Sequence, residues 1–305
     1  MTFSIVAFDP KTGDLGVAVQ SKCICAGLIV PWAKANIGAI ATQANPNTTF
    51  GPNGLDLLQS GMNASKVLDK LISNDDVKMR EHRQLAIIDK NGSVAAFTGK
   101  ECFYWAGHLT GENYSCQGNI LISGETVESM ASAFERTKGD LSDRLLATLN
   151  AADKEGRGDV RGKQAAALLV VREKCGYGGY TDRMVDIRID EHSEPIKELN
   201  RVFKIYDLSF LTRDDPSNLL NIEGEIASDI KNVLSELGYI KNLNTSTIEE
   251  WEKTDSLALE AWIGINNFEN KWRDDGKIWK SIYDYIRNEK GTPMVSLRKM
   301  SEVKE

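Results

Sequence analysis

Apolar positions in the first part of the chain form unbroken runs or two-residue repeats, which are typical of β-strands. Residues 2–8 (TFSIVAF) and 15–21 (LGVAVQS) flank the turn sequence DPKTGD, which predicts an antiparallel hairpin. Residues 28–32 and 37–42 are almost wholly apolar, as expected for strands that are covered on both faces. This pattern predicts a layered protein with its sheets in the interior.

Helical and strand patterns then alternate along the chain. Leu, Met and Val recur at helical spacing over residues 54–73, whereas residues 85–89 and 94–98 flank the hairpin turn DKNG. The segments that follow are a strand (114–122), two helices (127–137 and 141–153) and two strands (164–172 and 183–189). Paired helices between strands, without regular βαβ units, predict an α+β fold of stacked layers.

The last third of the chain has a different pattern. From residue 221 onward the apolar spacing is helical throughout, and this region holds four of the six Trp residues. A polar stretch over residues 191–215 precedes it. We therefore predict two domains, residues 1–212 and 213–305, the second being a small all-α domain with an aromatic core.

Composition narrows the classes of function. The 305 residues carry a formal net charge of -7, which argues against nucleic acid as a partner. The longest apolar run, residues 23–33, is too short to span a bilayer, and the start of the chain does not resemble a signal peptide. Five cysteines without a CxxC spacing favour a cytoplasmic location. No zinc spacing or nucleotide fingerprint occurs, so we expect neither metal nor cofactor.

Thr2 is the first candidate for chemistry. Methionine aminopeptidase normally removes Met before a small residue. Removal would leave Thr2 with a free α-amine on Cα and a hydroxyl on the neighbouring Cβ. An α-amine has a reference pKa of about 7.7–8.0, so it can act as a base at neutral pH and activate the hydroxyl. The alternative is that this start has no functional meaning, because chains that begin Met-Thr are common.

Four separated motifs resemble one protein family. They are TFSIVAFDPKTGDLGVAVQSK, IGAIATQANP, WAGHLTGENYSCQGN and GDVRGKQAAALLVV. Together they make residues 2–208 similar to the DUF1028 family, which is grouped with the N-terminal-nucleophile (Ntn) hydrolases. The resemblance implies a four-layer αββα Ntn-hydrolase-like sandwich. It implies no substrate, because the activity of that family is not established.

A weaker resemblance to proteasome β-subunits implies roles for individual residues. Thr2 would be the nucleophile, and Lys22 and Lys34 would stand where that group has its basic residues. Asp159 would stand near the aspartate that orients the amine. Gln20 stands near a position where that group usually has another aspartate. This chain therefore departs from the proton relay of that group.

The same resemblance implies an oxyanion hole, a set of N–H donors for the developing negative charge. Asn119 would supply it, or else the backbone N–H groups of Ala44 and Asn45. A side-chain and a main-chain donor are both consistent with the motifs.

Two further residues have both a structural and a functional interpretation. His108 lies in a Gly-flanked loop beside Trp105, where it either packs on the aromatic ring or lines a substrate pocket. Arg161 either forms a structural ion pair or binds a substrate carboxylate. A cleft lined by Trp105 and other aromatic residues would suit a small amide or peptide.

Residues 221–291 resemble a peptidoglycan-binding module. The motifs that carry this likeness are LSELGY and EEWEKTDSLALEAWIGINNFENKW. Because Leu, Ile and Trp at helical spacing first indicate a core, ligand binding, dimerisation and capping of a substrate stay open for this region.

Two functions follow from these observations. In the first, the protein is an amidohydrolase: Thr2 attacks an amide or peptide-like carbonyl, its amine takes the proton, Lys22 or Lys34 tunes that amine, and water resolves the covalent ester. In the second, it is a non-catalytic Ntn-fold scaffold that binds a partner or a glycan through its C-terminal domain. A homodimer is the default expectation, because Ntn folds often pair.

Overall fold

The computed structural model describes residues 2–154, 158 and 160–294. The chain divides into two compact units, residues 1–202 and 203–305, and each is considered by itself. Helix α6 (Pro195–Phe210) leads from the first unit into the second along the chain. The mixed α+β class expected from the sequence is confirmed.

The first unit contains a six-stranded antiparallel sheet with β1 and β2 at its centre. Its strands are, in spatial order, β10 (Arg183–Ile189), β9 (Ala165–Val171), β2 (Asp14–Ser21), β1 (Thr2–Asp9), β8 (Tyr114–Leu121) and β7 (Trp105–Gly111). β1 and β2 form the predicted hairpin, in which Thr2 lies opposite Ser21. Almost every residue of the two strands is buried, as their apolar runs indicated.

A second, four-stranded sheet packs on the first. Its strands are, in spatial order, β3 (Pro31–Lys34), β4 (Gly38–Gln43), β5 (Gln84–Asp89) and β6 (Val94–Thr98). Side chains from both sheets, among them Val6, Val17, Ala39 and Ile88, form one buried cluster. Because successive side chains of a strand point to opposite faces, alternate residues of each strand meet in this inter-sheet layer.

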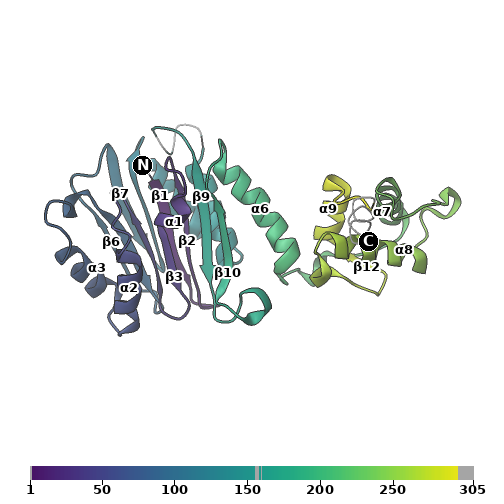
Figure 1. Ribbon diagram of the computed structural model, residues 1–305, viewed down its shortest axis with the longest axis horizontal. Coiled ribbons are helices and arrows are strands. Elements are labelled where there is room, and N and C mark those ends of the chain that lie inside the picture. The colour runs from purple at the N-terminus through teal and green to yellow at the C-terminus, as the bar shows by residue number, and fades with distance from the viewer. Residues whose placement is uncertain (1, 155–157, 159, 295–305) are drawn as a thin grey trace, which may run out of the picture. The chain divides into compact units, whose positions relative to one another are not determined.

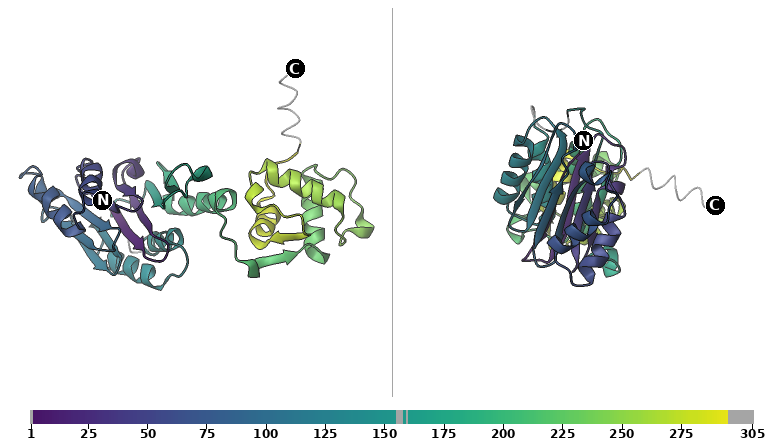
Figure 2. Two further views of the ribbon diagram at one scale, coloured as in Figure 1. Left: turned by 90° about the horizontal axis from the view of Figure 1, so that it is seen from below. Right: turned by 90° about the vertical axis from the view of Figure 1, so that its left-hand side faces the viewer.

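Helices cover the outer faces of the two sheets. α2 (Phe50–Gln59) and α3 (Ala64–Ser73) pack on the four-stranded sheet, α2 against β3 and β4 and α3 against β5 and β6 (Figure 1). α4 (Glu125–Arg136) and α5 (Leu141–Ala152) pack on the six-stranded sheet. Figure 2 shows the same unit from two other directions. Helices with one apolar face are expected where a sheet needs covering from water.

The strand predicted over residues 28–32 is wrong in part. Ala26–Ile29 form the short helix α1, which Cys25 precedes in the left-handed region (φ 56°). β3 therefore begins only at Pro31. A run of apolar residues this short does not distinguish a buried helical turn from a strand.

The loop predicted around His108 is also wrong, because this residue lies within strand β7. The glycines on either side of it serve close packing rather than a turn. A Cβ on Gly111 would lie 2.3 Å from the ring of Tyr114. Glycine in a strand often marks such a close approach.

The second unit is mainly helical, as expected, and has an aromatic core. Its helices are α7 (Gly224–Glu236), α8 (Lys253–Ile265) and α9 (Lys280–Glu289). Trp262 is fully buried, with its ring centroid 5.9 Å from that of Phe268. The sequence did not predict the small antiparallel sheet of β11 (Leu219–Asn221) and β12 (Lys277–Trp279).

The buried side chain of Lys231 holds two loop segments of the second unit in place. Lys231 forms an ion pair of 2.9 Å with Asp255 and donates to the carbonyls of Thr247 and Glu250. Short 3₁₀ helices complete the secondary structure, at Arg80–His82, Tyr177–Gly179, Pro216–Asn218, Thr245–Thr247 and Glu269–Lys271. In the part of the chain that the structure describes, no helix is long and apolar enough to cross a bilayer.

Candidate active site

A cavity of about 460 Å³ opens at the end of the inter-sheet layer where β1 begins. Its described lining residues are Thr2, Ser21, Lys22, Cys23, Ile29, Gln43, Ala44, Asn45, Pro46, His82, Glu101, Cys102, Phe103, Asn119, Ile120 and Arg161. They come from both sheets and from the loops between them. Residues far apart in sequence therefore meet at one place.

Thr2 lies in the wall of this cavity and is buried, with 7% of its surface exposed. Its Oγ1 lies 2.9 Å from the Oγ of Ser21, its partner on β2. On the other side, β8 places Asn119 opposite Thr2. The side chain of Thr2 is thus held by a central strand and has a hydroxyl neighbour. Ser21 was not singled out in the sequence, although the hairpin register alone would have placed it there.

Of the two candidate lysines, the structure brings only Lys22 to the cavity. Its Nζ donates to the carbonyl of Lys163 at 3.1 Å. Lys34 pairs with Gly38 on β4, five residues from Gln43 at the cavity, a separation of about 16 Å along a strand.

The Nζ of Lys34 donates to Gln59 Oε1 at 2.6 Å. The structure therefore does not bring Lys34 to this cavity, because it lies beside the turn of the β3–β4 hairpin.

The other predicted site residues divide into two groups. Asn119, Asn45 and Arg161 line the cavity. His108 and Trp105 lie on β7, and neither belongs to the described lining of the cavity. The pKa of His108 is lowered by its burial, and its Nδ1 lies 2.9 Å from Thr98 Oγ1. Asp159 lies outside the described residues.

Three residues of the cavity lining have a left-handed backbone conformation. Ala44 (φ 56°) and Asn45 (φ 50°) adopt it consecutively after β4, and Ile120 (φ 57°) adopts it within β8. A β-branched residue at positive φ is an outlier. Such conformations persist only where the surrounding structure enforces them, and they cluster at functional sites.

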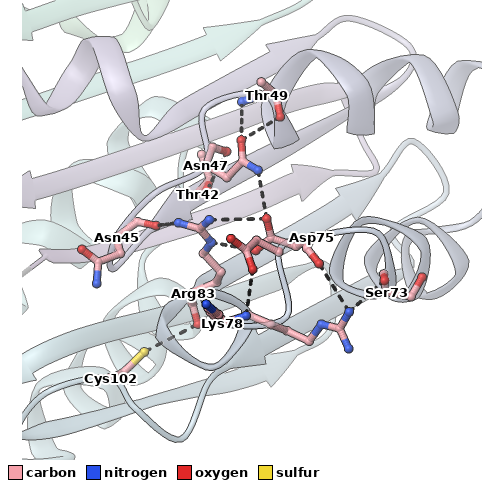
Figure 3. A network of polar contacts seen from close by, with 11 residues as sticks. Thr42, Asn45, Asn47, Thr49, Ser73, Asp75, Lys78, Arg83 and Cys102 are labelled. Carbon is pink, nitrogen blue, oxygen red and sulfur yellow. Dashed lines mark hydrogen bonds and ion pairs between the residues drawn. The ribbon is translucent and has the colours of Figure 1, made fainter.

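An ion pair holds the turn at Ala44 and Asn45 in place, as Figure 3 shows. Arg83 donates to the carbonyl oxygen of Asn45 and to Asp75 Oδ2, the latter at 2.7 Å. Asn47 donates to Asp75 Oδ1 at 3.2 Å. Burial alone would raise the pKa of Asp75, but the hydrogen bonds from Arg83 and Asn47 outweigh it and hold that pKa below its usual value.

A chain of neutral polar side chains occupies the inter-sheet layer behind the cavity. Gln84 Oε1 accepts from Gln43 Nε2 at 2.7 Å and from Asn119 Nδ2 at 2.9 Å. Ser4 donates to Gln43 Oε1 and accepts from Gln117 Nε2, both at 2.7 Å. We call these five residues the carboxamide network; all are buried.

This geometry can be compared with known proteins. The model of the "Family of unknown function (DUF1028)" matches residues 2–199. The chain belongs to the DUF1028 family. A crystal structure of the DUF1028 protein SPO2555 from Silicibacter pomeroyi is 32% identical and covers 69% of this chain and 91% of its own, with a TM-score of 0.61.

More distant likenesses were also found for this DUF1028 protein. Anbu, the ancestral beta-subunit from Yersinia bercovieri, is 11% identical and covers 67% of this chain and 93% of its own, with a TM-score of 0.33. The model named "Putative peptidoglycan binding domain" matches residues 209–286, within the second unit. The search of curated proteins found no match.

The chemistry open to the DUF1028 cavity follows from its lining. Two hydroxyl groups, the cationic side chains of Lys22 and Arg161, and a left-handed turn meet there. In the part of the chain that the structure describes, no cluster of His, Cys, Asp and Glu could hold a metal ion. The arrangement suits nucleophilic attack on a polarised carbonyl.

Proposed function

We propose that this protein is an Ntn-type amidohydrolase that cleaves an amide or peptide-like bond through an ester on Thr2. The observation that carries the proposal is the position of Thr2, whose hydroxyl lines the cavity 2.9 Å from Ser21. Two sheets covered by helices on their outer faces are consistent with the four-layer αββα sandwich of Ntn hydrolases. The nucleophile would be fixed on the central strand β1.

The reaction begins once Met1 has been removed. Thr2 Oγ1 attacks the amide carbon while its proton passes to the free α-amine. The tetrahedral intermediate collapses, the C–N bond breaks and the leaving amine takes that proton. The α-amine then accepts a proton from water, whose oxygen attacks the ester carbon. The bond between that carbon and Thr2 Oγ1 breaks, Oγ1 takes the proton back from the amine, and the carboxylic acid is released.

Charge in the cavity would support this sequence of steps. Lys22 would disfavour a second positive charge and so lower the pKa of the α-amine. Arg161 would bind a carboxylate of the substrate. Backbone N–H groups of the turn at Ala44 and Asn45 would bind the oxyanion, and Arg83 would keep that turn in place.

The second unit supports an alternative function. Its match to a peptidoglycan-binding model is the specific observation in favour of glycan binding. The protein would then be a non-catalytic scaffold that binds a glycan through residues 213–305. A homodimer stays a prediction under either function.

The test is the intact mass of the untagged protein, followed by acetylation with p-nitrophenyl acetate. We expect Met1 to be absent and one acetyl group to appear on the peptide that begins with Thr2. Thr2→Ser should retain this acetylation and Thr2→Ala should lose it, together with any activity on an amide library. Retained Met1, or equal acetylation of Thr2→Ala, would refute the proposal and leave glycan binding as the leading function.

A further inference from the structure

The direction of the hydrogen bonds in the carboxamide network is set by two backbone carbonyls. Gln84 Nε2 lies 2.8 Å from the oxygen of Gly118 and 3.1 Å from that of Gly107. A carbonyl oxygen can only accept, so the amide nitrogen of Gln84 must face them. The Oε1 of Gln84 must then face Gln43 and Asn119.

The orientation of the other side chains follows from that of Gln84. Two oxygens at hydrogen-bond distance would repel, so Asn119 and Gln43 must both present nitrogen to Gln84 Oε1. Gln43 Oε1 then requires the hydroxyl proton of Ser4, and Ser4 Oγ accepts from Gln117. Ser115 donates to the oxygen of Gln117 at 2.9 Å. Each amide has one orientation that satisfies all its partners.

This orientation decides which atom Asn119 offers to the cavity. One of the two N–H groups of its nitrogen is donated to Gln84, which leaves the other N–H group and the acceptor Oδ1 for partners at the cavity that Asn119 lines. No other described residue donates to that oxygen. A carboxamide oxygen can only accept, so the Oδ1 of Asn119 requires a donor at the cavity.

Thr2 can supply a donor for this oxygen. Asn119 lies directly opposite Thr2 across the β1–β8 pair, where side chains on one face approach within about 5 Å. The hydroxyl of Thr2 already has Ser21 as its partner. The N–H groups of its freed α-amine have the right polarity.

We infer that Asn119 is a positioning residue whose Oδ1 accepts a hydrogen bond from the α-amine of Thr2. This inference rests on the proposed function. A neutral acceptor orients the amine, so that its lone pair is free for the Thr2 hydroxyl. It does so without the full stabilisation of the ammonium form that a carboxylate would bring.

The experiment measures the pKa of the Thr2 α-amine from the pH dependence of its carbamylation by potassium cyanate, followed by the mass of the N-terminal peptide. The ionisable side chains of the described cavity lining are present in every variant: Lys22, Cys23, His82, Glu101, Cys102 and Arg161. Asn119→Asp keeps an acceptor and adds a charge, whereas Asn119→Ala removes the acceptor. Asn232→Ala, an exposed change in the second unit, is the matched control.

We expect Asn119→Asp to raise the pKa of the amine by about one unit and Asn119→Ala to lower it by about half a unit. At pH values above the pKa of the amine, p-nitrophenyl acetate should still acetylate Asn119→Ala, because the backbone N–H groups of Ala44 and Asn45 remain to bind the oxyanion. The inference is overturned if neither variant moves the pKa of the amine, and loss of acetylation by Asn119→Ala at every pH would then assign Asn119 to the oxyanion hole. In that case the proposed nucleophile still stands, whereas retained Met1 would remove both.

Discussion

The two halves of the inter-sheet layer differ in a way that fold stability alone does not explain. In one half, Val6, Ala39 and Ile88 form an apolar cluster between the sheets. In the other half, the same three strands place Ser4, Gln43 and Gln84 in positions that are just as buried. The strands and their alternation are shared, and only the chemistry of the side chains changes.

The polar half of the layer, which the carboxamide network occupies, has a stricter requirement than the apolar half. A buried carboxamide is costly unless each of its polar atoms finds a partner, and a partly satisfied network is worse than an apolar one. Stability alone would be served by continuing the apolar pattern to the end of the strands. The network instead lies beside Thr2 and gives each amide one orientation, as a site that must hold a fixed geometry requires.

The largest effect is expected when the central residue of the carboxamide network is replaced by an apolar one. Gln84→Leu leaves Asn119 and Gln43 without their shared acceptor, and leaves the carbonyls of Gly107 and Gly118 without their donor. We expect the free energy of unfolding of the first unit to fall by about 4 kcal/mol. Urea unfolding, read by hydrogen exchange of peptides from β1 and β8, assigns the loss to this unit.

The matched control for Gln84→Leu lies four residues further along β5. Ile88→Val removes one methylene from the apolar half and should cost about 1 kcal/mol. Equal losses for the two variants would mean that the carboxamide network is no more tightly coupled than ordinary packing. The distinction between the two halves would then be one of composition only.

The next largest effect is expected at the ion pair beside the cavity. Arg83→Met leaves Asp75 as a buried carboxylate without its charge partner, since only 3% of its side chain is exposed. We expect a loss of about 3 kcal/mol in the free energy of unfolding. The turn at Ala44 and Asn45 should lose its protection from hydrogen exchange, because Arg83 no longer binds the carbonyl of Asn45.

The pH dependence of stability provides the control for this ion pair. The pKa of Asp75 is lower in the folded protein than its ordinary value of 3.8. Its contribution is therefore present above about pH 4 and is lost as the pH falls through the folded pKa. Arg83→Met/Asp75→Asn should recover much of the stability and lose this acid-dependent part. If the double variant is as unstable as Arg83→Met, the uncompensated charge is not the cause.

The sequence predicted much of the fold because its signals are local. The hairpin of β1 and β2 follows from two apolar runs around DPKTGD, and the helices α4 and α5 follow from their apolar spacing. The two local errors, at α1 and β7, come from short segments. There the tertiary packing of glycine or of a single helical turn decides the structure.

The site was less predictable because it depends on the register between segments far apart in sequence. Thr2 and Asn119 were proposed from motifs, and the structure places them opposite each other. Gln43 and Gln84 resemble ordinary polar ends of strands, so nothing local indicates that they are buried against each other. Lys34 pairs with Gly38 beside the turn of the β3–β4 hairpin and so lies at the opposite end of β4 from Gln43.

The smallest predicted effect concerns the two cysteines that line the cavity, Cys23 and Cys102. Burial raises the pKa of Cys102 to about 11, whereas Cys23 is exposed. Because the thiolate is the reactive form, iodoacetamide at pH 8 should alkylate Cys102 at least about tenfold more slowly than Cys23. Cys175, which is exposed and outside the cavity lining, is the control for access. If the carboxamide network also keeps the cavity wall closed, Gln84→Leu should reduce the difference between the alkylation rates of Cys23 and Cys102. Similar rates for the two cysteines in the unaltered protein would show that the wall near Cys102 opens readily to solvent.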